Sequence, residues 1–344
     1  MNVAVLGAGS WGTALAATLV KNACRVTIWA RDRQVAQEIN VQNQNSRYLP
    51  GAKLPVGLHA TTELEDALIA SNVVIFAVPS GSMRDVVERS KPLITGHPIL
   101  CHAVKGFDPQ TSSTMTDLIL EYHPEAEKRV CVIAGPSHAE EVVTGLPTTI
   151  VAAAYSRLTA ETVQDLLMNR VLRVYTNPDV KGAELGGALK NIIALGVGIA
   201  DGLGFGDNAK AALMTRGLTE IARLGLKLGA SVLTFAGLSG VGDLIVTCTS
   251  RHSRNYQTGK WLGQGKSLEE ALKLVGMAVE GINTTRIAVA LAATHGIEMP
   301  IAQALYEVLF DGKAPRTAVE DLMTRARIHE IEEIASEQIS ASWD

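Results

Sequence analysis

Hydrophobic residues follow two different periods along this 344-residue chain, and the period changes about halfway along it. In the first half, short runs rich in Val, Ile, Ala and Cys alternate with longer mixed segments. Continuous apolar runs of this length are typical of parallel strands that are covered on both faces. The predicted strands cover residues 3–6, 24–29, 73–78, 99–104, 130–134, 148–154 and 171–175. The first half therefore predicts an α/β fold with a doubly wound, mainly parallel sheet.

Beyond residue 179 the apolar residues recur at three- and four-residue spacing, which indicates amphipathic helices. Gly229 and Gly296 stand where helices should end, and Pro300 and Pro315 stand where helices should begin. The predicted helices cover residues 184–200, 207–228, 280–294, 300–310 and 315–327.

The change of period divides the chain into two predicted domains. A sheet domain covers residues 1–179, and an all-α domain covers residues 180–344. Two capping boxes, which begin at Thr62 and Ser267, each predict the start of a further helix.

The connecting segments also carry predictions. Two glycine-rich turns, at residues 202–206 and 237–242, are candidates for facing the cleft between the domains. The polar segment 41–55, with Tyr48 as its aromatic residue, predicts a loop or lid. From residue 330 onward the chain predicts a polar, partly frayed tail.

The first predicted strand runs directly into Gly7-Ala8-Gly9-Ser10-Trp11-Gly12, which matches the pattern G-x-G-x-x-G. Gly7 allows a tight turn, Gly9 leaves room for a pyrophosphate, and Gly12 lets the next helix pack closely on the strand. A helix N-terminus at this position presents free backbone N–H groups to the anion. Because a second strand follows the helix, the motif has the βαβ context of a Rossmann-type dinucleotide-binding domain.

Composition adds limits on the ligand and the compartment. With 47% hydrophobic residues the chain can bury two cores, and its net charge of −4 comes without a dense basic run. This pattern excludes the usual nucleic-acid binder and favours a small anionic ligand held by a few cations. Four scattered cysteines, Cys24, Cys101, Cys131 and Cys248, predict no metal site, no disulfide framework and a reducing cytoplasm.

The sequence predicts no export signal and no membrane anchor. Its N-terminus begins directly with a strand, without the basic and apolar regions of a signal peptide. No apolar run approaches the roughly 18 residues of a membrane span.

Arg31 and Asp32 follow the second predicted strand, close to the position where NAD-selective sites carry an acidic residue for the ribose 2′-hydroxyl. The first charge here is positive, which favours the 2′-phosphate of NADP. A solvent-exposed arginine is the alternative, and Asp32 keeps NAD open. The predicted cofactor is therefore NADP(H) or NAD(H).

A hydride-transfer enzyme of this organisation needs an acid or base, which we expect in the helical domain. Lys190 lies in the middle of an otherwise apolar helix, so it must either reach the surface or be functional. Burial would lower its pKa towards the range that suits proton transfer. Asp243 could orient an ammonium group or merely cap a turn. Residues 253–255, Ser-Arg-Asn, could bind a phosphate or form a solvated loop.

Two strand ends and two histidines complete the candidates. Lys105 follows one predicted strand and residues 135–138 follow the next, at the edge where open α/β sheets bind ligands. His102 lies within an apolar strand and is expected to be a core histidine. His138 could touch substrate or cofactor, but nothing nearby in sequence orients it, so Lys190 is preferred.

Together these residues resemble the bacterial NAD(P)-dependent sn-glycerol-3-phosphate dehydrogenases over nearly the whole chain. The landmarks are residues 7–16, 105–106, 135–137, 189–191, 202–206, 240–244, 253–255 and 279–281. The chain departs from the family pattern at His138, where an aromatic residue is common, at Glu140, where lysine can occur, and at Ile282, where tyrosine is frequent. These departures concern local packing rather than the reaction.

The resemblance implies a role for each matching residue, with Lys190 as the proton acceptor. The substrate site it implies is formed by Lys105, Gly135, Ser137, Lys190, Asp243, Ser253, Arg254 and Asn255. The implied dinucleotide contacts, besides the motif residues Gly7, Gly9 and Gly12, are Ser10, Trp11, Arg31, Tyr48, Lys105, Ala139, Arg254, Val279 and Glu280. The implied reaction interconverts dihydroxyacetone phosphate and sn-glycerol 3-phosphate in the cytoplasm, supplies glycerophospholipid synthesis, and allows for a homodimer.

In the reducing direction, we expect hydride to reach the carbonyl carbon while protonated Lys190 protonates the developing alkoxide. Lys105 is the second cation, and Arg254 fixes the phosphate. A 3-hydroxyacid or ketopantoate reductase of the same architecture is the first alternative, with a carboxylate in place of the phosphate. A non-catalytic NADP sensor is the second, and Lys190 argues against it because a sensor needs no proton donor.

Overall fold

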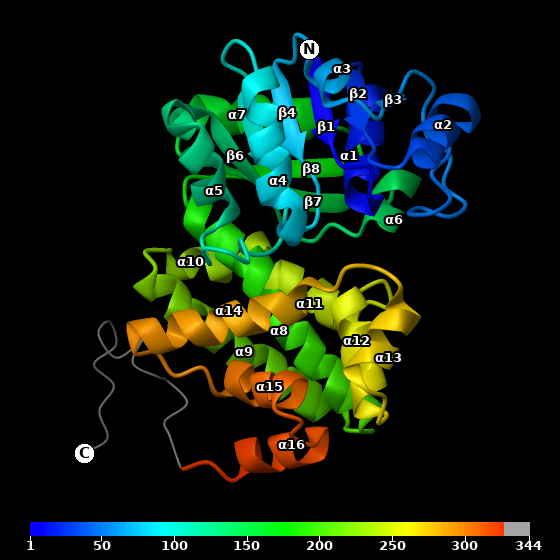
Figure 1. Ribbon diagram of the computed structural model, residues 1–344. Coiled ribbons are helices and arrows are strands. Elements are labelled where there is room, and N and C mark those ends of the chain that lie inside the picture. Colours follow the sequence, from blue (N-terminus) through cyan, green and yellow to red (C-terminus); the bar gives the residue numbers. More distant parts are fainter. Residues whose placement is uncertain (327–344) are drawn as a thin grey trace.

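The computed structural model describes residues 1–326 and consists of a sheet half above a helical half (Figure 1). Its strands are β1 Asn2–Leu6, β2 Arg25–Trp29, β3 His59–Thr61, β4 Val73–Phe76, β5 Ile99–His102, β6 Val130–Ala134, β7 Thr148–Ala154 and β8 Leu172–Asn177. They form one sheet in the order β3-β2-β1-β4-β5-β6-β7-β8. All neighbours pair in parallel except β6 and β7, which run antiparallel. The predicted mainly parallel sheet is confirmed, with the short β3 as an addition.

Helices cover both faces of the sheet, because every central strand carries apolar side chains on both sides. The helices of this half are α1 Ser10–Lys21, α2 Arg33–Gln42, α3 Leu64–Leu68, α4 Ser80–Ser90, α5 Met115–Tyr122, α6 Ala139–Thr144 and α7 Arg157–Leu167, with 3₁₀ turns at Lys91–Leu93 and Pro124–Arg129. One face packs against α1, α2, α6 and α7, and the other against α3, α4 and α5.

A single long helix, α8 (Val180–Gly202), forms the centre of the helical half. Its first turns lie on the sheet, where Val180 and Ala183 pack against β6 and β7. The helix then continues into the helical half, so one element belongs to both cores. Around it lie α9 Asp207–Lys227, α10 Val232–Phe235, α11 Asp243–Thr249, α12 Arg254–Gly263, α13 Leu268–Val275, α14 Glu280–His295, α15 Pro300–Phe310 and α16 Pro315–Met323, with a π-helical turn at Leu238–Gly242.

By length and composition α8 resembles a membrane-spanning helix, although no apolar run of that length was expected. Its apolar stretch is completely buried inside the protein. It is therefore the core helix of this half, and no other helix in residues 1–326 passes the same criteria.

Glycines bring α8 and α12 into backbone contact. A Cβ atom added at Gly198 would lie 2.1 Å from the Tyr256 carbonyl oxygen, and one at Gly259 would lie 2.1 Å from the Leu195 carbonyl oxygen. Any larger residue at these positions would push the helices apart. The glycines therefore fix the position of α12 relative to α8.

Three local predictions are wrong or lie outside the described residues. The capping box at Thr62 does not form: α3 begins at Leu64, and the hydroxyl of Thr61 instead accepts the Glu63 N–H at 3.1 Å. The box at Ser267 is confirmed in both of its hydrogen bonds. The predicted helix 315–327 ends at Met323, and both residue 327 and the predicted tail from residue 330 fall beyond the part described.

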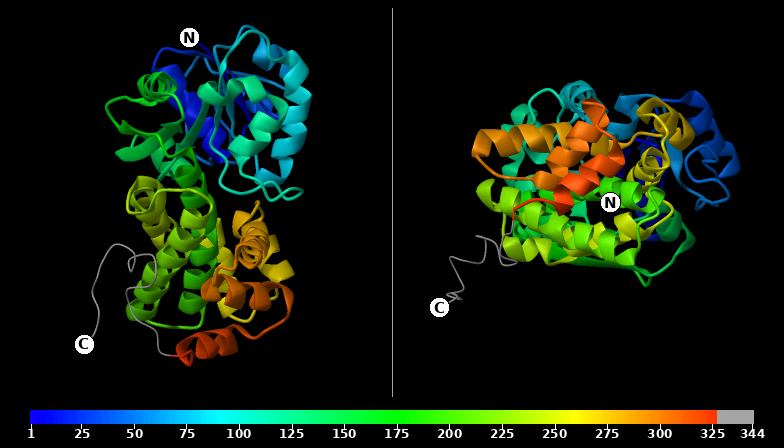
Figure 2. Two further views of the ribbon diagram at one scale, coloured as in Figure 1. Left: turned by 90° about the vertical axis from the view of Figure 1, so that its left-hand side faces the viewer. Right: turned by 90° about the horizontal axis from the view of Figure 1, so that it is seen from below.

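The two glycine-rich turns have different positions. The turn at residues 237–242 packs against β7 and α8 at the junction of the two halves, as expected. The turn at 202–206 follows the far end of α8, roughly 30 Å from the first residue at about 1.5 Å per residue, so the expectation that it faces the cleft is wrong. Figure 2 shows the two halves from the side and from below.

Candidate functional site

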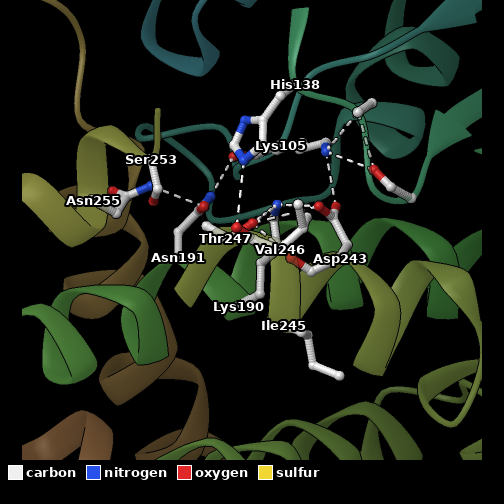
Figure 3. A network of polar contacts seen from close by, with 12 residues as sticks. Lys105, His138, Lys190, Asn191, Asp243, Ile245, Val246, Thr247, Ser253 and Asn255 are labelled. Carbon is white, nitrogen blue, oxygen red and sulfur yellow. Dashed lines mark hydrogen bonds and ion pairs between the residues drawn. The ribbon is translucent and has the colours of Figure 1, made fainter. Parts of the chain in front are cut away.

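A network of charged and polar side chains occupies the junction between the sheet and the helical half (Figure 3). Lys105 follows β5, and its ammonium group donates to the Gly135 carbonyl at 3.0 Å and to the Ser137 hydroxyl at 3.2 Å. The same group pairs with Asp243 Oδ2 at 2.8 Å. The adjacent parallel strands β5 and β6 thus bring Lys105, Gly135 and Ser137 together, as strand-end residues should be.

Lys190 reaches the same carboxylate from α8. Its ammonium group donates to Asp243 Oδ1 and, at 2.6 Å, to the Thr247 hydroxyl. Thr247 in turn donates to the Asp243 carbonyl at 2.6 Å, as expected for residues four apart on one helix. Thr247 is absent from the predicted site. The signal that could have found it is the i, i+4 spacing from Asp243.

The two lysines that share Asp243 differ in burial. The Lys190 side chain is 5% exposed, whereas that of Lys105 is 21% exposed. Burial is the largest influence on Lys190 and lowers its pKa; attraction to Asp243 opposes it and the charge of Lys105 adds to it, so the pKa falls from 10.5 to about 7. At that pKa the group can both give and accept a proton near neutral pH.

Asp243 is fully enclosed between these two cations. Burial alone raises the pKa of its carboxyl group, but attraction to Lys105 and then Lys190 outweighs burial, so the pKa lies below its ordinary value. Asp243 is therefore an anion that holds both ammonium groups in place rather than an acid in the reaction.

A chain of amide hydrogen bonds links the lysine cluster to two further helices. Asn191 donates to the Lys105 carbonyl at 3.3 Å and accepts from Asn255 at 2.9 Å. Asn255 also accepts the Gly281 N–H at 2.9 Å. The backbone N–H of Asn255 at the start of α12 and the second N–H of its side-chain amide remain for a ligand.

Arg254 and Ser253 lie beside this chain at the N-terminus of α12. Ser253 caps the helix by accepting the Tyr256 N–H at 3.2 Å. Within the described residues the Arg254 guanidinium makes no hydrogen bond or ion pair. A phosphate at this point would meet a cation and free backbone N–H groups together.

The glycine motif has the geometry that its pattern predicts. Gly7 adopts a φ of +120°, and a Cβ at Gly12 would lie 1.9 Å from the Gly7 carbonyl oxygen. A Cβ at Gly9 would meet nothing within 4 Å, which leaves open space next to the N-terminus of α1. The buried indole N–H of Trp11 has no partner in the structure. These features fit a dinucleotide, whose pyrophosphate would lie beside Gly9, within reach of the free backbone N–H groups at the start of α1.

The other residues that are expected to contact the cofactor come from four segments. Ala139 opens α6, while Val279 and Glu280 stand at the start of α14. The Glu280 carboxylate accepts hydrogen bonds from both the backbone N–H, at 3.0 Å, and the hydroxyl of Ser80, the first residue of α4. This contact joins the helical half to the sheet half beside Lys105. Arg31 and Tyr48 lie around the end of β2.

The two histidines differ in their surroundings, and His102 lies in the core as expected. His102 is completely buried, 3.0 Å from Glu184 Oε1 and 3.3 Å from the Thr116 hydroxyl, so it is a core residue. His138 lies beside the lysine cluster and donates to the Val246 carbonyl at 3.4 Å. Burial lowers the pKa of His138, and this hydrogen bond opposes the shift. No cluster of three or more His, Cys, Asp or Glu side chains suited to a metal occurs in residues 1–326.

The fold and this site define the class of the protein: a Rossmann-type, nucleotide-dependent dehydrogenase with a helical second domain. Two family models match the chain, the N-terminal domain of NAD-dependent glycerol-3-phosphate dehydrogenase over residues 2–160 and its C-terminal domain over residues 179–320. The chain belongs to the NAD-dependent glycerol-3-phosphate dehydrogenase family.

Curated relatives agree with this family over nearly the full length. A glycerol-3-phosphate dehydrogenase [NAD(P)+] of Pelotomaculum thermopropionicum is 54% identical over 97% of this chain and 96% of its own. The corresponding protein of Bacillus mycoides is 55% identical over 96% of this chain and 98% of its own.

Solved structures separate the family from its architectural neighbours. Glycerol-3-phosphate dehydrogenase from Coxiella burnetii matches with a TM-score of 0.90 and 38% identity, covering 94% of this chain and 99% of that one. A ketopantoate reductase from Ralstonia eutropha matches with a TM-score of 0.58 and 15% identity, covering 94% and 100%, which shows a shared fold alone.

Proposed function

We propose that the protein interconverts dihydroxyacetone phosphate and sn-glycerol 3-phosphate with NAD(P)H or NAD(P)+. The observation that carries this proposal is the buried ammonium group of Lys190, held by Asp243 and Thr247 with a pKa of about 7. The names of the relatives support the choice of substrate.

The bound nicotinamide supplies or accepts the hydride, and the chain supplies charge and protons. In the reducing direction, Lys190 as an ammonium gives one proton to the carbonyl oxygen of the substrate as that oxygen becomes an alkoxide. The proton leaves Nζ as the new O–H bond forms, and Lys190 remains as a neutral amine. In the reverse direction the amine accepts the proton of the substrate hydroxyl.

Lys105 places a second positive charge beside the reacting oxygen, where it stabilises the charge that develops there. Asp243 pairs with both ammonium groups and so holds them side by side at this junction. Arg254 and the N-terminus of α12 would hold the phosphate, so that binding energy remote from the reaction orients the carbonyl carbon.

Cellular and architectural predictions belong to the same proposal. We infer that residues 1–179 bind the dinucleotide and that residues 180–344 supply most of the substrate site, since β8 ends at Asn177 and α8 begins at Val180. A cytoplasmic location, a supply of product to glycerophospholipid synthesis, the absence of membrane or nucleic-acid partners, and a homodimer stay predictions.

The direct test follows oxidation of NADPH and, separately, of NADH by the purified protein. Dihydroxyacetone phosphate, unphosphorylated dihydroxyacetone and ketopantoate serve as parallel substrates. We expect rapid turnover that requires the phosphate group. Turnover of ketopantoate in place of dihydroxyacetone phosphate would contradict the proposed substrate and favour the carboxylate-binding alternative.

A further inference from the structure

The loop that follows α2 lies against the end of β2, where the adenosine ribose of a bound dinucleotide is read. Asp32 lies 20 residues after Gly12, which is the usual spacing of the acidic residue that binds the 2′-hydroxyl. Arg31 directly precedes it. The structure shows what this carboxylate does instead of facing a ribose.

Both oxygens of Asp32 already have protein partners. Oδ1 accepts the Gln34 N–H at 2.8 Å and so caps the start of α2. Oδ2 pairs with the Arg47 guanidinium at 2.7 Å. Arg47 therefore brings a second arginine to the strand end that is followed by Arg31 and Asp32.

The loop holds Arg47 in this position through backbone and buried contacts. Asn45 is completely buried, and its side-chain amide donates to the Ala8 carbonyl at 2.9 Å and to the Thr13 hydroxyl at 2.8 Å. The loop is thereby fixed to the glycine motif itself. The N–H of Ser46 donates to the Glu38 carboxylate at 3.1 and 3.2 Å, so this nearby anion is also engaged.

Arg47 also lies over the ring of Tyr48, with its guanidinium carbon 5.4 Å from the ring centroid. Its side chain is 61% exposed, and that of Asp32 is 36% exposed. An ion pair this exposed is weak. A phosphate group, with a charge approaching −2 and three acceptor oxygens, is a stronger partner for Arg47 than the singly charged Asp32 carboxylate.

We propose that Arg47 determines cofactor choice: it exchanges the Asp32 carboxylate for the 2′-phosphate of NADP(H), which it binds together with Arg31. This inference rests on the proposed dinucleotide-dependent function and names the residue that discriminates between the two cofactors. Arg31 alone was expected from the sequence, because Arg47 is distant along the chain and lies in a polar loop.

The test measures binding rather than turnover, so it is independent of the substrate assignment. Dissociation constants are measured for NADPH and NADH by fluorescence, and for 2′,5′-ADP and 5′-ADP by calorimetry. The variants are Arg47→Met and Arg31→Met, which keep the apolar stem and remove the charge. Arg25→Met removes an exposed arginine at the opposite end of β2 and is the matched control.

We expect Arg47→Met to weaken NADPH and 2′,5′-ADP about tenfold or more, since charge-assisted hydrogen bonds to phosphate are lost. Binding of NADH and 5′-ADP should change less than twofold, and Arg25→Met should change none of the four constants. The proposal is overturned if Arg47→Met weakens both members of a pair equally or neither of them. Wild-type protein that binds none of the four would overturn it together with the proposed function, whereas selective nucleotide binding without turnover of dihydroxyacetone phosphate would contradict only the function.

Discussion

The sheet half and the helical half each present a lysine to the same carboxylate, but they do so in different ways. Lys105 stands on a loop at a strand end, contacts a backbone carbonyl and a serine, and keeps some contact with water. Lys190 is enclosed within the helical core. Because both share Asp243, the contrast shows that burial, rather than the choice of ionic partner, makes Lys190 the residue suited to proton transfer.

The largest expected effect separates these two roles. Lys190→Met should lower kcat about 100- to 10,000-fold, because the reacting oxygen loses its proton donor. Lys105→Met should lower kcat less, since it removes a charge that stabilises the developing alkoxide but leaves the proton donor in place. Steady-state kinetics with dihydroxyacetone phosphate measures both variants. Equal losses of kcat in the two would remove the distinction, and unchanged NADPH binding by Lys190→Met is the control.

A second prediction compares a glycine at a helix contact in the helical half with an exposed glycine in the sheet half. Gly259→Ala should lower the free energy of unfolding by about 1–3 kcal/mol, because the added Cβ would overlap the backbone of α8. The control is Gly81→Ala in α4, where an added Cβ meets nothing within 4 Å and alanine favours the helix. Denaturant unfolding measures both. A stability of Gly259→Ala equal to that of wild type would show that the two helices separate at no cost.

A third prediction uses the pKa of Lys190. Reduction needs the ammonium form, so kcat should be constant below pH 7 and fall as the pH rises through about 7. Oxidation of glycerol 3-phosphate needs the neutral amine and should show the opposite slope. A reduction rate that stays constant up to pH 10 would mean that burial does not lower this pKa in the working enzyme.

The smallest effect comes from Thr247→Val. It removes an acceptor that stabilises the ammonium form of Lys190, so the pKa of Lys190 should fall. The pH at which the reduction rate declines should therefore be lower by about half a unit to one unit. Thr249→Val is the matched control, because Thr249 lies on the same helix and makes the same backbone hydrogen bond at an exposed position. The pH profiles of kcat for both variants measure this shift. A shift in the control alone would contradict the role of Thr247.

The sequence was sufficient where the geometry of the site depends on a local pattern. The glycine motif predicted the turn at Gly7 and the space at Gly9, and an isolated cation in an apolar helix pointed to Lys190. Strand ends predicted that Lys105 and Ser137 would meet, because the carboxyl ends of neighbouring parallel strands share one edge.

The sequence was insufficient where the site depends on packing between distant segments. Helix α12 was not predicted from the sequence, because Gly259 and Gly263 weaken its helical signal, yet these glycines are what permit contact with α8. The hydrogen bonds of Asn255 with Asn191 and Gly281 join three helices, and no local pattern indicates them. Thr62 matched a capping box by spacing alone, but the helix begins elsewhere.

The antiparallel strand β7 has a mechanical consequence. Because β7 runs antiparallel to β6, the chain returns to the end of the sheet that lies away from the carboxyl ends of β5 and β6. Helix α8 can then run along the sheet face and onward through the helical half. A rigid helix shared by both halves resists a hinge at that side. We therefore expect any opening for substrate entry and product exit to occur on the side where Glu280 meets Ser80, so that exchange of ligands alternates with the making and breaking of that contact.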